Sequence, residues 1–170
     1  MKKVLFIIAP ENFRDEELLV PKSFLEAKGV ECQVASITTQ TATGSMGAEV
    51  TPDLAVKDAN PADYNAVIVI GGPGSPALAN YPEVIDLLKS VDQASQVLAA
   101  ICIAPTVVAK AGLVKNKKVT CFETEETPNI ISEAGGTYTG KKVTRDGNLI
   151  TANGPAAAKK FAKTIYNAIK

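Results

Sequence analysis

Cys102 is the residue of this sequence whose position best suits chemistry, and the chain that carries it has no histidine. The cysteine lies between an apolar run at residues 97–101 and a helix-like stretch that begins at Ala104. At such a strand-to-helix turn a side chain stands above the sheet, and the backbone N–H of the next residue, Ile103, points into the same space. Cysteine nucleophiles usually rely on a nearby imidazole. Any chemistry at Cys102 must therefore use a carboxyl group, backbone amides or the substrate.

A glycine-rich loop, Gly71-Gly72-Pro73-Gly74, follows another apolar run. It lacks the lysine of a phosphate-binding loop, so a plain turn is favoured over nucleotide binding. The helix predicted after Cys102 is expected to lower the thiol pKa from about 8.5. On residue type alone, an inert buried thiol remains the more common role for a cysteine after an apolar run.

Composition indicates one soluble domain spanning residues 1–170, with 46% hydrophobic and 21% charged residues. Eighteen basic residues balance eighteen acidic ones, and no Lys/Arg stripe is interleaved with aromatics, so nucleic-acid binding is not expected. No apolar run approaches the roughly 20 residues that cross a bilayer, so no membrane partner is expected. Three cysteines without framework spacing indicate reduced thiols and a cytoplasmic location, and no metal site is expected.

Short β-prone runs alternate with helical patterns, which predicts an α/β fold with a mostly parallel sheet and helices on both faces. The predicted strands are continuously apolar, as in strands buried on both sides. They cover residues 3–9, 31–37, 66–70, 97–101 and 119–122. The predicted helices cover residues 15–28, 82–92, 104–111, 128–133 and 155–169, with proline starts and glycine stops at several ends.

Two segments interrupt the alternation. Residues 142–151 contain an Asp-Gly turn between β-prone runs and predict a C-terminal β-hairpin. Residues 42–50, with two glycines, indicate a small excursion or hairpin outside the sheet. Pro21 falls inside the first predicted helix, where it should kink the helix or remove a hydrogen bond.

Four motifs, in order and at matching spacing, resemble the PfpI/ThiJ family of the class I glutamine amidotransferase-like superfamily, which includes the parkinsonism-associated protein deglycase. The resemblance covers essentially the whole chain. The motifs are Phe13-Arg14-Asp15-Glu16-Glu17-Leu18-Leu19-Val20-Pro21, Val67-Ile68-Val69-Ile70-Gly71-Gly72-Pro73-Gly74, Ala99-Ala100-Ile101-Cys102-Ile103-Ala104-Pro105 and Asp146-Gly147-Asn148-Leu149-Ile150-Thr151-Ala152-Asn153-Gly154-Pro155.

The resemblance implies a flavodoxin-like three-layer sandwich that forms homodimers or higher oligomers. It also implies that Cys102 is the nucleophile, that Glu17 hydrogen-bonds it, and that the backbone N–H groups of Gly72 and Ile103 form an oxyanion site. Without it, Glu17 would be read as solvated helix surface within a run of acids. With it, we expect a buried, protonated Glu17 that donates a hydrogen bond to the thiolate.

The remaining expected pocket residues are Gly71, Phe122 and Cys121. Cys32 and Cys121 are each expected to be buried structural thiols, with a role as a resolving thiol as the alternative for Cys121. Family members called intracellular proteases carry histidine where this chain has Ile103, and the deglycase branch carries one at the position of Phe122. Both histidines are absent here, which disfavours a Cys-His peptidase.

The sequence therefore predicts a cofactor-free, cysteine-dependent stress-response enzyme of the glyoxalase or deglycase type. Its substrate would be a small-molecule aldehyde or a glycated protein. The alternatives are a redox-sensing or chaperone-like stress protein that acts through oxidation of Cys102, and an intracellular cysteine peptidase.

Overall fold

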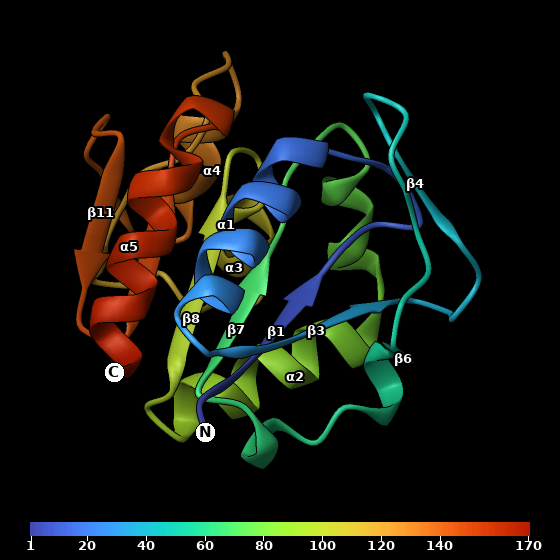
Figure 1. Cartoon of the computed structure of the whole chain (residues 1–170). Helices are drawn as coiled ribbons and strands as arrows, with labels where there is room; N and C mark the ends of the chain where they lie inside the picture. The colour runs from blue at the N-terminus through green and yellow to red at the C-terminus, as the bar shows by residue number, and fades with distance from the viewer.

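The computed structural model describes residues 1–170 and contains a central seven-stranded sheet in the order β11-β12-β8-β7-β1-β3-β6 (Figure 1). Every neighbouring pair is parallel except β11 and β12, which form the predicted hairpin. The strands of this sheet are β1 (Lys3–Ile7), β3 (Glu31–Ser36), β6 (Leu54–Ala55), β7 (Ala66–Val69), β8 (Val97–Ile101), β11 (Val143–Asp146) and β12 (Leu149–Ala152).

Helices cover both faces of the sheet (Figure 1). The α-helices are α1 (Asp15–Ala27), α2 (Pro82–Gln93), α3 (Pro105–Lys110), α4 (Thr127–Glu133) and α5 (Ala158–Ile169). Alternate residues of the buried strands point to opposite faces, so they build two separate cores. One core contains Leu18 and Leu25 of α1 with Phe161 and Ile165 of α5, and the other contains side chains of α2, α3 and α4. The three-layer α/β sandwich is thereby confirmed.

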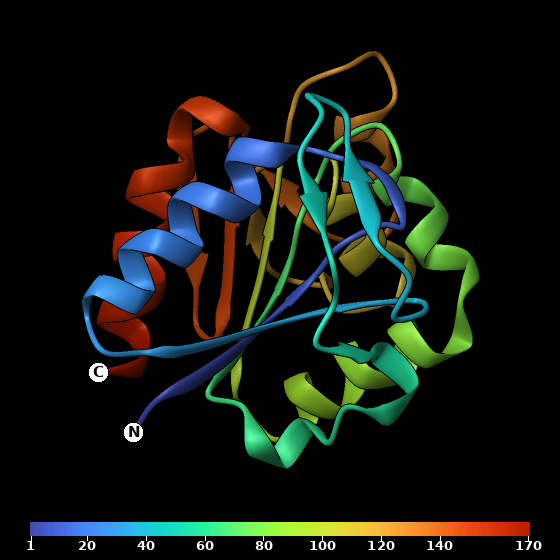
Figure 2. The same ribbon diagram turned by 45° about the vertical axis from the view of Figure 1, so that its right-hand side comes forward.

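A second, three-stranded sheet lies at one end of the molecule. It joins β2 (Glu11–Phe13), β4 (Ala42–Gly44) and β5 (Glu49–Val50) in the order β2-β4-β5. The antiparallel pair β4 and β5 is the predicted excursion at residues 42–50, and Figure 2 shows it beside the first turn of α1. The buried carboxylate of Asp15 accepts hydrogen bonds from the backbone N–H groups of Met46 (3.1 Å) and Ala48 (2.8 Å). This contact fastens the hairpin tip to the start of α1.

The predicted strand at residues 119–122 is wrong as a member of the main sheet. Only Lys118–Val119 (β9) is a strand, and it pairs with Thr137–Tyr138 (β10) in a separate two-stranded sheet. The chain then turns toward the end of β8, where the N–H of Phe122 donates to the carbonyl oxygen of Cys102 at 2.8 Å. A backbone bond to the turn after β8 therefore replaces the expected strand pairing.

Helix ends follow the sequence closely, with two differences. The predicted helix at residues 155–169 begins as a 3-10 turn, Pro155–Ala157, before α5. The predicted helix after Cys102 is shorter than expected, because α3 spans six residues. Helix α1 continues through Pro21, whose ring is buried in the core. No helix in the structure combines the length and the apolar character needed to cross a membrane.

Candidate functional site

Cys102 occupies a sharp turn between β8 and α3, as the sequence predicts. Its φ of 65° lies in the left-handed region, which a non-glycine residue adopts only when its surroundings hold it there. Two backbone hydrogen bonds hold it, from its own N–H to the Ala152 carbonyl (2.9 Å) and from the N–H of Phe122 to its carbonyl (2.8 Å). The side chain is only 7% exposed. The elbow therefore presents the thiol at the carboxyl edge of the sheet in a largely enclosed position.

Glu17 reaches the same point from the first turn of α1 and is fully buried. Its Oε1 accepts a hydrogen bond from the backbone N–H of Gly71 at 3.1 Å. Its Oε2 is buried without a hydrogen-bond partner. The Cys102 thiol lies close enough for its interaction with this carboxyl to shift the pKa of both residues.

Gly71 lies where three elements meet, and its lack of a side chain allows them to approach. A Cβ at this position would lie 2.7 Å from both Cys102 Cβ and Glu17 Oε1, and 2.5 Å from the carbonyl oxygen of Ile101. The carbonyl of Gly71 in turn accepts from the N–H of Arg14 at 2.9 Å, directly before α1. The glycine-rich loop thus fixes the spacing between the helix that carries Glu17 and the turn that carries Cys102.

The pKa values of the two reactive groups are linked through their contact. Burial raises the pKa of Glu17 from 4.5 to about 7, against the opposing effects of its hydrogen bonds with Cys102 and Gly71. Burial also raises the pKa of Cys102 to about 12, and the negative charge of Glu17 adds to the rise. Because two such close acids titrate together, we treat them as one pair that releases its first proton near pH 7.

The predicted lowering of the Cys102 pKa is therefore wrong in direction. The backbone N–H groups of Ile103 and Gly72 do act to lower this pKa. Burial and the carboxylate outweigh them, and the short α3 adds only a small dipole. The expectation of a raised Glu17 pKa is confirmed.

A cavity of about 500 Å³ opens beside the elbow. It is lined by Ile103, Thr106 and Lys110 from the elbow and α3, and by residues 124–127 from the loop before α4. Of the predicted pocket residues, Ile103 lines this cavity, whereas Phe122 is 45% exposed on the neighbouring surface and Gly71 lies beneath the thiol. Cys102 itself does not line the cavity, but its neighbour Ile103 does.

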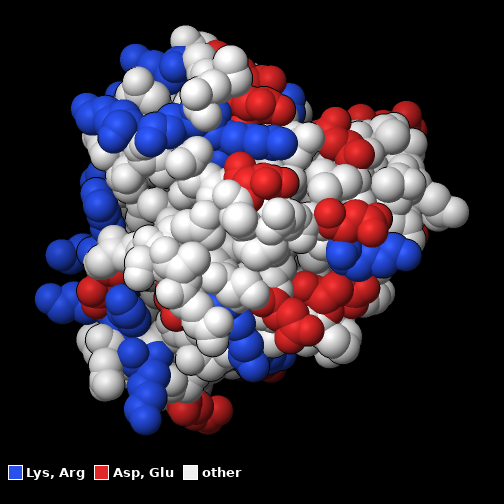
Figure 3. All heavy atoms as spheres, turned by 90° about the horizontal axis from the view of Figure 1, so that it is seen from below, with Lys and Arg blue, Asp and Glu red and all other residues white.

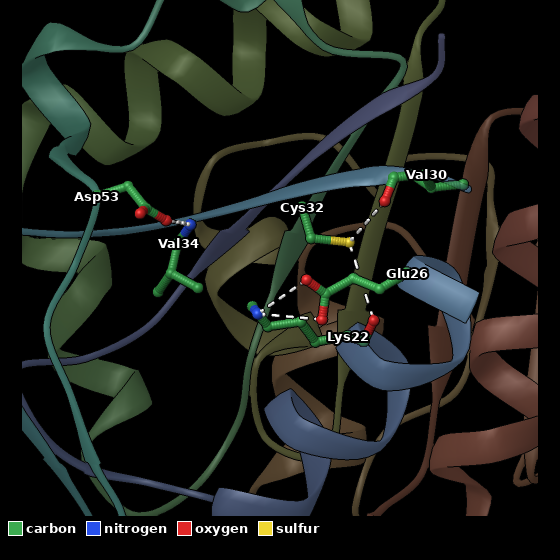
Figure 4. Close-up of polar contacts among 6 residues, drawn as sticks. All are labelled: Lys22, Glu26, Val30, Cys32, Val34 and Asp53. Atoms are coloured by element: carbon green, nitrogen blue, oxygen red, sulfur yellow. Dashed lines mark hydrogen bonds and ion pairs between the residues drawn. The ribbon is translucent and has the colours of Figure 1, made fainter. Parts of the chain in front are cut away.

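Neither of the other two cysteines lines the cavity beside Cys102. Cys121 is fully buried in the core that α2, α3 and α4 share, whereas Cys102 belongs to the opposite core. Cys32 sits on β3 with its sulfur directed at the carbonyl oxygens of Lys22 (3.9 Å) and Val30 (3.8 Å), as Figure 4 shows. Burial raises the pKa of both thiols, to about 12 for Cys32. Neither is placed to act with Glu17.

The roles of two residues near the site, Arg14 and Asp15, were not predicted from the sequence. Arg14 pairs with Glu16 at 2.8 Å through a half-buried guanidinium, and its positive charge also lowers the pKa of Glu17. Asp15 anchors the β4–β5 hairpin, as described above. Both lie in the motif at residues 13–21, but their roles depend on residues that are neighbours only in the folded structure. No cluster of three or more His, Cys, Asp or Glu side chains has the arrangement of a metal site.

Known proteins similar to this chain belong to one family. A sequence model of the DJ-1/PfpI family matches residues 2–168. An uncharacterized protein of Methanocaldococcus jannaschii is 38% identical, with 99% of this chain and 82% of that protein covered. The glutathione-independent glyoxalase DJR-1.2 of Caenorhabditis elegans is 31% identical, with 99% and 89% covered. Deglycase PfpI of Pyrococcus furiosus is 28% identical, with 90% of each chain covered.

Solved structures extend the similarity to the whole fold. The ThiJ/PfpI domain protein of Brachyspira murdochii superposes with a TM-score of 0.93 at 26% identity, covering 98% of this chain and 95% of that one.

Proposed function

Because the chain belongs to the DJ-1/PfpI family, we propose that it is a cysteine-dependent, cofactor-free stress-response enzyme that acts on reactive carbonyls. The names of two relatives, a glutathione-independent glyoxalase and a deglycase, support this substrate class. The substrates would be dicarbonyls such as methylglyoxal and glyoxal, or their early adducts with protein thiols and amines.

The observation that carries the proposal is the closeness of Cys102, held at positive φ, to the buried carboxyl of Glu17, since a Cβ on Gly71 would lie 2.7 Å from both side chains. In a chain without histidine this carboxyl is the group available to take the thiol proton. A pair that loses its first proton near pH 7 is suited to proton transfer under physiological conditions. The same absence of histidine disfavours a Cys-His peptidase.

The first step would form a bond between Cys102 Sγ and the aldehyde carbon while the thiol proton passes to Glu17. The carbonyl oxygen becomes an oxyanion, held by the backbone N–H groups of Gly72 and Ile103, and is then protonated to a hemithioacetal. For methylglyoxal, Glu17 would next move the proton of the former aldehyde carbon to the adjacent carbon, while the hydroxyl proton moves from the first oxygen to the second, which leaves a lactoyl thioester on Cys102. Water would hydrolyse the resulting thioester, releasing lactate and restoring the thiol.

Lactate formation from methylglyoxal by the purified protein tests this proposal. We expect turnover that Cys102→Ser abolishes and that Glu17→Gln reduces by about 100-fold, the size associated with loss of a general acid–base. Cys32→Ser is the matched control and should keep full activity. Absence of turnover by the wild-type protein on free dicarbonyls and on glycated thiols or amines would sink the proposal.

Thiol alkylation separates activation of Cys102 from turnover. The rate of Cys102 alkylation by iodoacetamide should rise with pH through about 7 in the wild type, because the pair then loses its first proton. In Glu17→Gln the rise through pH 7 should disappear, since no carboxylate remains to take the thiol proton, and Cys102 should ionise in one step below the wild-type value of about 12 because the charge that raises its pKa is gone. Identical pH profiles for the two proteins would contradict the paired mechanism.

Redox sensing through Cys102 is the second candidate function. The amides of Gly72 and Ile103, which lower the pKa of the thiol, would also hold the oxygens of a sulfinate. Oxidation starts from the thiolate, however, and the raised pKa of Cys102 slows that start. Intact-mass analysis after mild peroxide treatment decides this: two oxygens gained on Cys102 alone support sensing, and unmodified Cys102 rejects it.

A further inference from the structure

The charges of this electrically neutral chain are divided unevenly. Residues 141–170 contain seven Lys and Arg but a single acidic residue, Asp146. The remaining residues, 1–140, therefore carry a net charge of −6. Figure 3 shows the consequence in space, with basic side chains gathered on the side of α5 and β11 and acidic side chains mainly on the opposite side. A zero net charge thus conceals a strongly basic surface.

Five exposed lysines form what we call the basic face, and the packing of α1 against α5 brings them together (Figure 1). Four lie on α5 or at its end, and the fifth follows the last residue of α1. They are Lys28, Lys159, Lys160, Lys163 and Lys170. On α5 the basic positions occupy one side of the helix, and the opposite side is buried in the core.

None of these lysines has an ionic partner. The structure contains three ion pairs, and all of them lie within the first 31 residues. The acidic residue of α1 nearest in sequence to the basic face, Glu26, is bound by Lys22 at 3.2 Å. The positive charge of the basic face is therefore not neutralised within the molecule.

Aromatic rings lie within the basic face. Phe24 of α1 and Tyr166 of α5 meet edge to face, with ring centroids 6.5 Å apart. The Lys28 ammonium lies over both rings, 5.7 Å and 5.8 Å from their centroids. A cavity of about 310 Å³ is bordered by these two rings together with Lys28, Lys163, Asn167 and Lys170. Folding thus adds Phe24 of α1, and Lys28 at its end, to the lysines and Tyr166 of α5.

Helix stability does not account for this arrangement. Lys28 and Lys170 stand at the C-terminal ends of α1 and α5, where a cation favours the helix dipole. Lys159 and Lys160 lie in the first turn of α5, where a cation opposes the dipole and no acidic residue is present. A ligand of opposite charge would explain lysines at both ends of the same helix.

We propose that the basic face binds the sugar-phosphate backbone of single-stranded nucleic acid, with a base against Tyr166 or Phe24. A cationic groove with aromatic rings is the usual arrangement for binding single strands without sequence preference. An anionic membrane is less well matched, because the large apolar residues of α5, Phe161, Ile165 and Ile169, are buried and none is free to insert.

Fluorescence anisotropy with a labelled twelve-nucleotide oligothymidylate tests the proposal. Each phosphate contact lowers the logarithm of affinity by about 0.7 per tenfold rise in salt, so four contacts predict a slope of about −3. The triple variant Lys28→Gln, Lys163→Gln, Lys170→Gln should bind at least about tenfold more weakly. A second triple, with arginine at the same positions, should restore binding because it restores the charge.

The matched control is Lys57→Gln, Lys89→Gln, Lys115→Gln, which removes the same charge from exposed lysines outside the basic face. It should bind like the wild type. Thermal melting checks that every variant is folded. Equal weakening by both glutamine triples, a slope near zero, or no binding at about 100 µM protein in low salt would overturn the proposal. Binding to phosphatidylserine vesicles without binding to the oligonucleotide would do so too, and would assign the face to membranes.

Discussion

Glu17 is a residue at which folding and chemistry oppose each other. The carboxyl is fully buried, and its burial raises the pKa to about 7. In the unfolded chain the same group would titrate near its ordinary value of 4.5. Folding therefore favours the protonated acid, whereas proton transfer from Cys102 requires the carboxylate. The protein keeps an ionisable group in a place where an amide would be more stable.

This conflict predicts that Glu17→Gln stabilises the protein at alkaline pH. The folded state holds its proton between pH 4.5 and about 7 while the unfolded state has lost it, so wild-type stability falls across that window as pH rises. The amide has no proton to lose, and its advantage should reach up to about 3 kcal/mol at pH 8 and vanish near pH 4. Urea unfolding at both pH values measures the difference. A constant difference across the range would contradict the raised pKa.

The neighbours of Glu17 illustrate what sequence reasoning at this scale reached and what it did not. In the run of acids that opens α1, Asp15 binds the hairpin amides, Glu16 pairs with Arg14 at the surface and Glu17 is buried. Composition treats the three alike, as solvated helix surface. The resemblance to a known family singled out Glu17, but Asp15 depends on a hairpin about 30 residues away, which no local pattern connects to it.

At the scale of elements, the glycine-rich loop sets the distance between two parts of the site. Gly71→Ala should push Glu17 and Cys102 apart, because the new Cβ would overlap both side chains and the Ile101 carbonyl. We expect a loss of about 1–3 kcal/mol in unfolding free energy and loss of lactate formation.

Gly154→Ala is the control for this substitution. That glycine has an extended backbone with a φ of 162°, and its Cβ would meet only Phe122 at an ordinary 3.7 Å. Chemical denaturation and the lactate assay should leave this control close to the wild type. If the two alanine variants behaved alike, close packing at Gly71 would not be what maintains the site.

Long elements were predictable, and very short ones were not. Buried parallel strands such as β7 and β8 are continuous apolar runs, so the sequence locates them within a residue or two. Strands of two or three residues, such as β2 and β6, carry no periodic signal and form only because a neighbour offers backbone groups. Residues 119–122 have the composition of a strand, but the N–H of Phe122 donates a hydrogen bond to the carbonyl of Cys102 and not to a neighbouring strand.

At the scale of the whole molecule, the homodimer stays a prediction. The structure has an exposed apolar surface through which two copies of the chain could associate. Leu19 and Val20 on α1 are 45% and 39% exposed, and Met46 on the adjoining hairpin is 65% exposed. Large apolar side chains gathered on one surface are typical of interaction sites. We expect Leu19→Lys to convert a dimer into a monomer of half the mass in sedimentation equilibrium, whereas Gln93→Lys on α2 should not. A monomeric wild type would refute the prediction.

Net charge was the least informative sequence property at this scale. A net charge of zero argued against nucleic-acid binding, because the charges of the basic and acidic residues cancel. The fold separates them, since the chain from residue 141 onward is almost entirely basic and its last helix lies on one side of the molecule. Lys28 joins that side only because α1 packs against α5. Such a surface is a property of the tertiary structure, and composition cannot reveal it.

The separation of Cys102 and Cys121 into opposite cores has a consequence for repair after oxidative damage. Cys121 lies in the opposite core, and Cys32, which packs at the edge of the same core as Cys102, has its sulfur directed at the carbonyl oxygens of Lys22 and Val30, so neither thiol is directed at a sulfenic acid on Cys102. Its rescue therefore depends on a small thiol or a reductase from outside, and prolonged exposure leads on to irreversible acids. Under the proposed function, the protein would therefore lose its activity on carbonyls when Cys102 is oxidised faster than the cell reduces it.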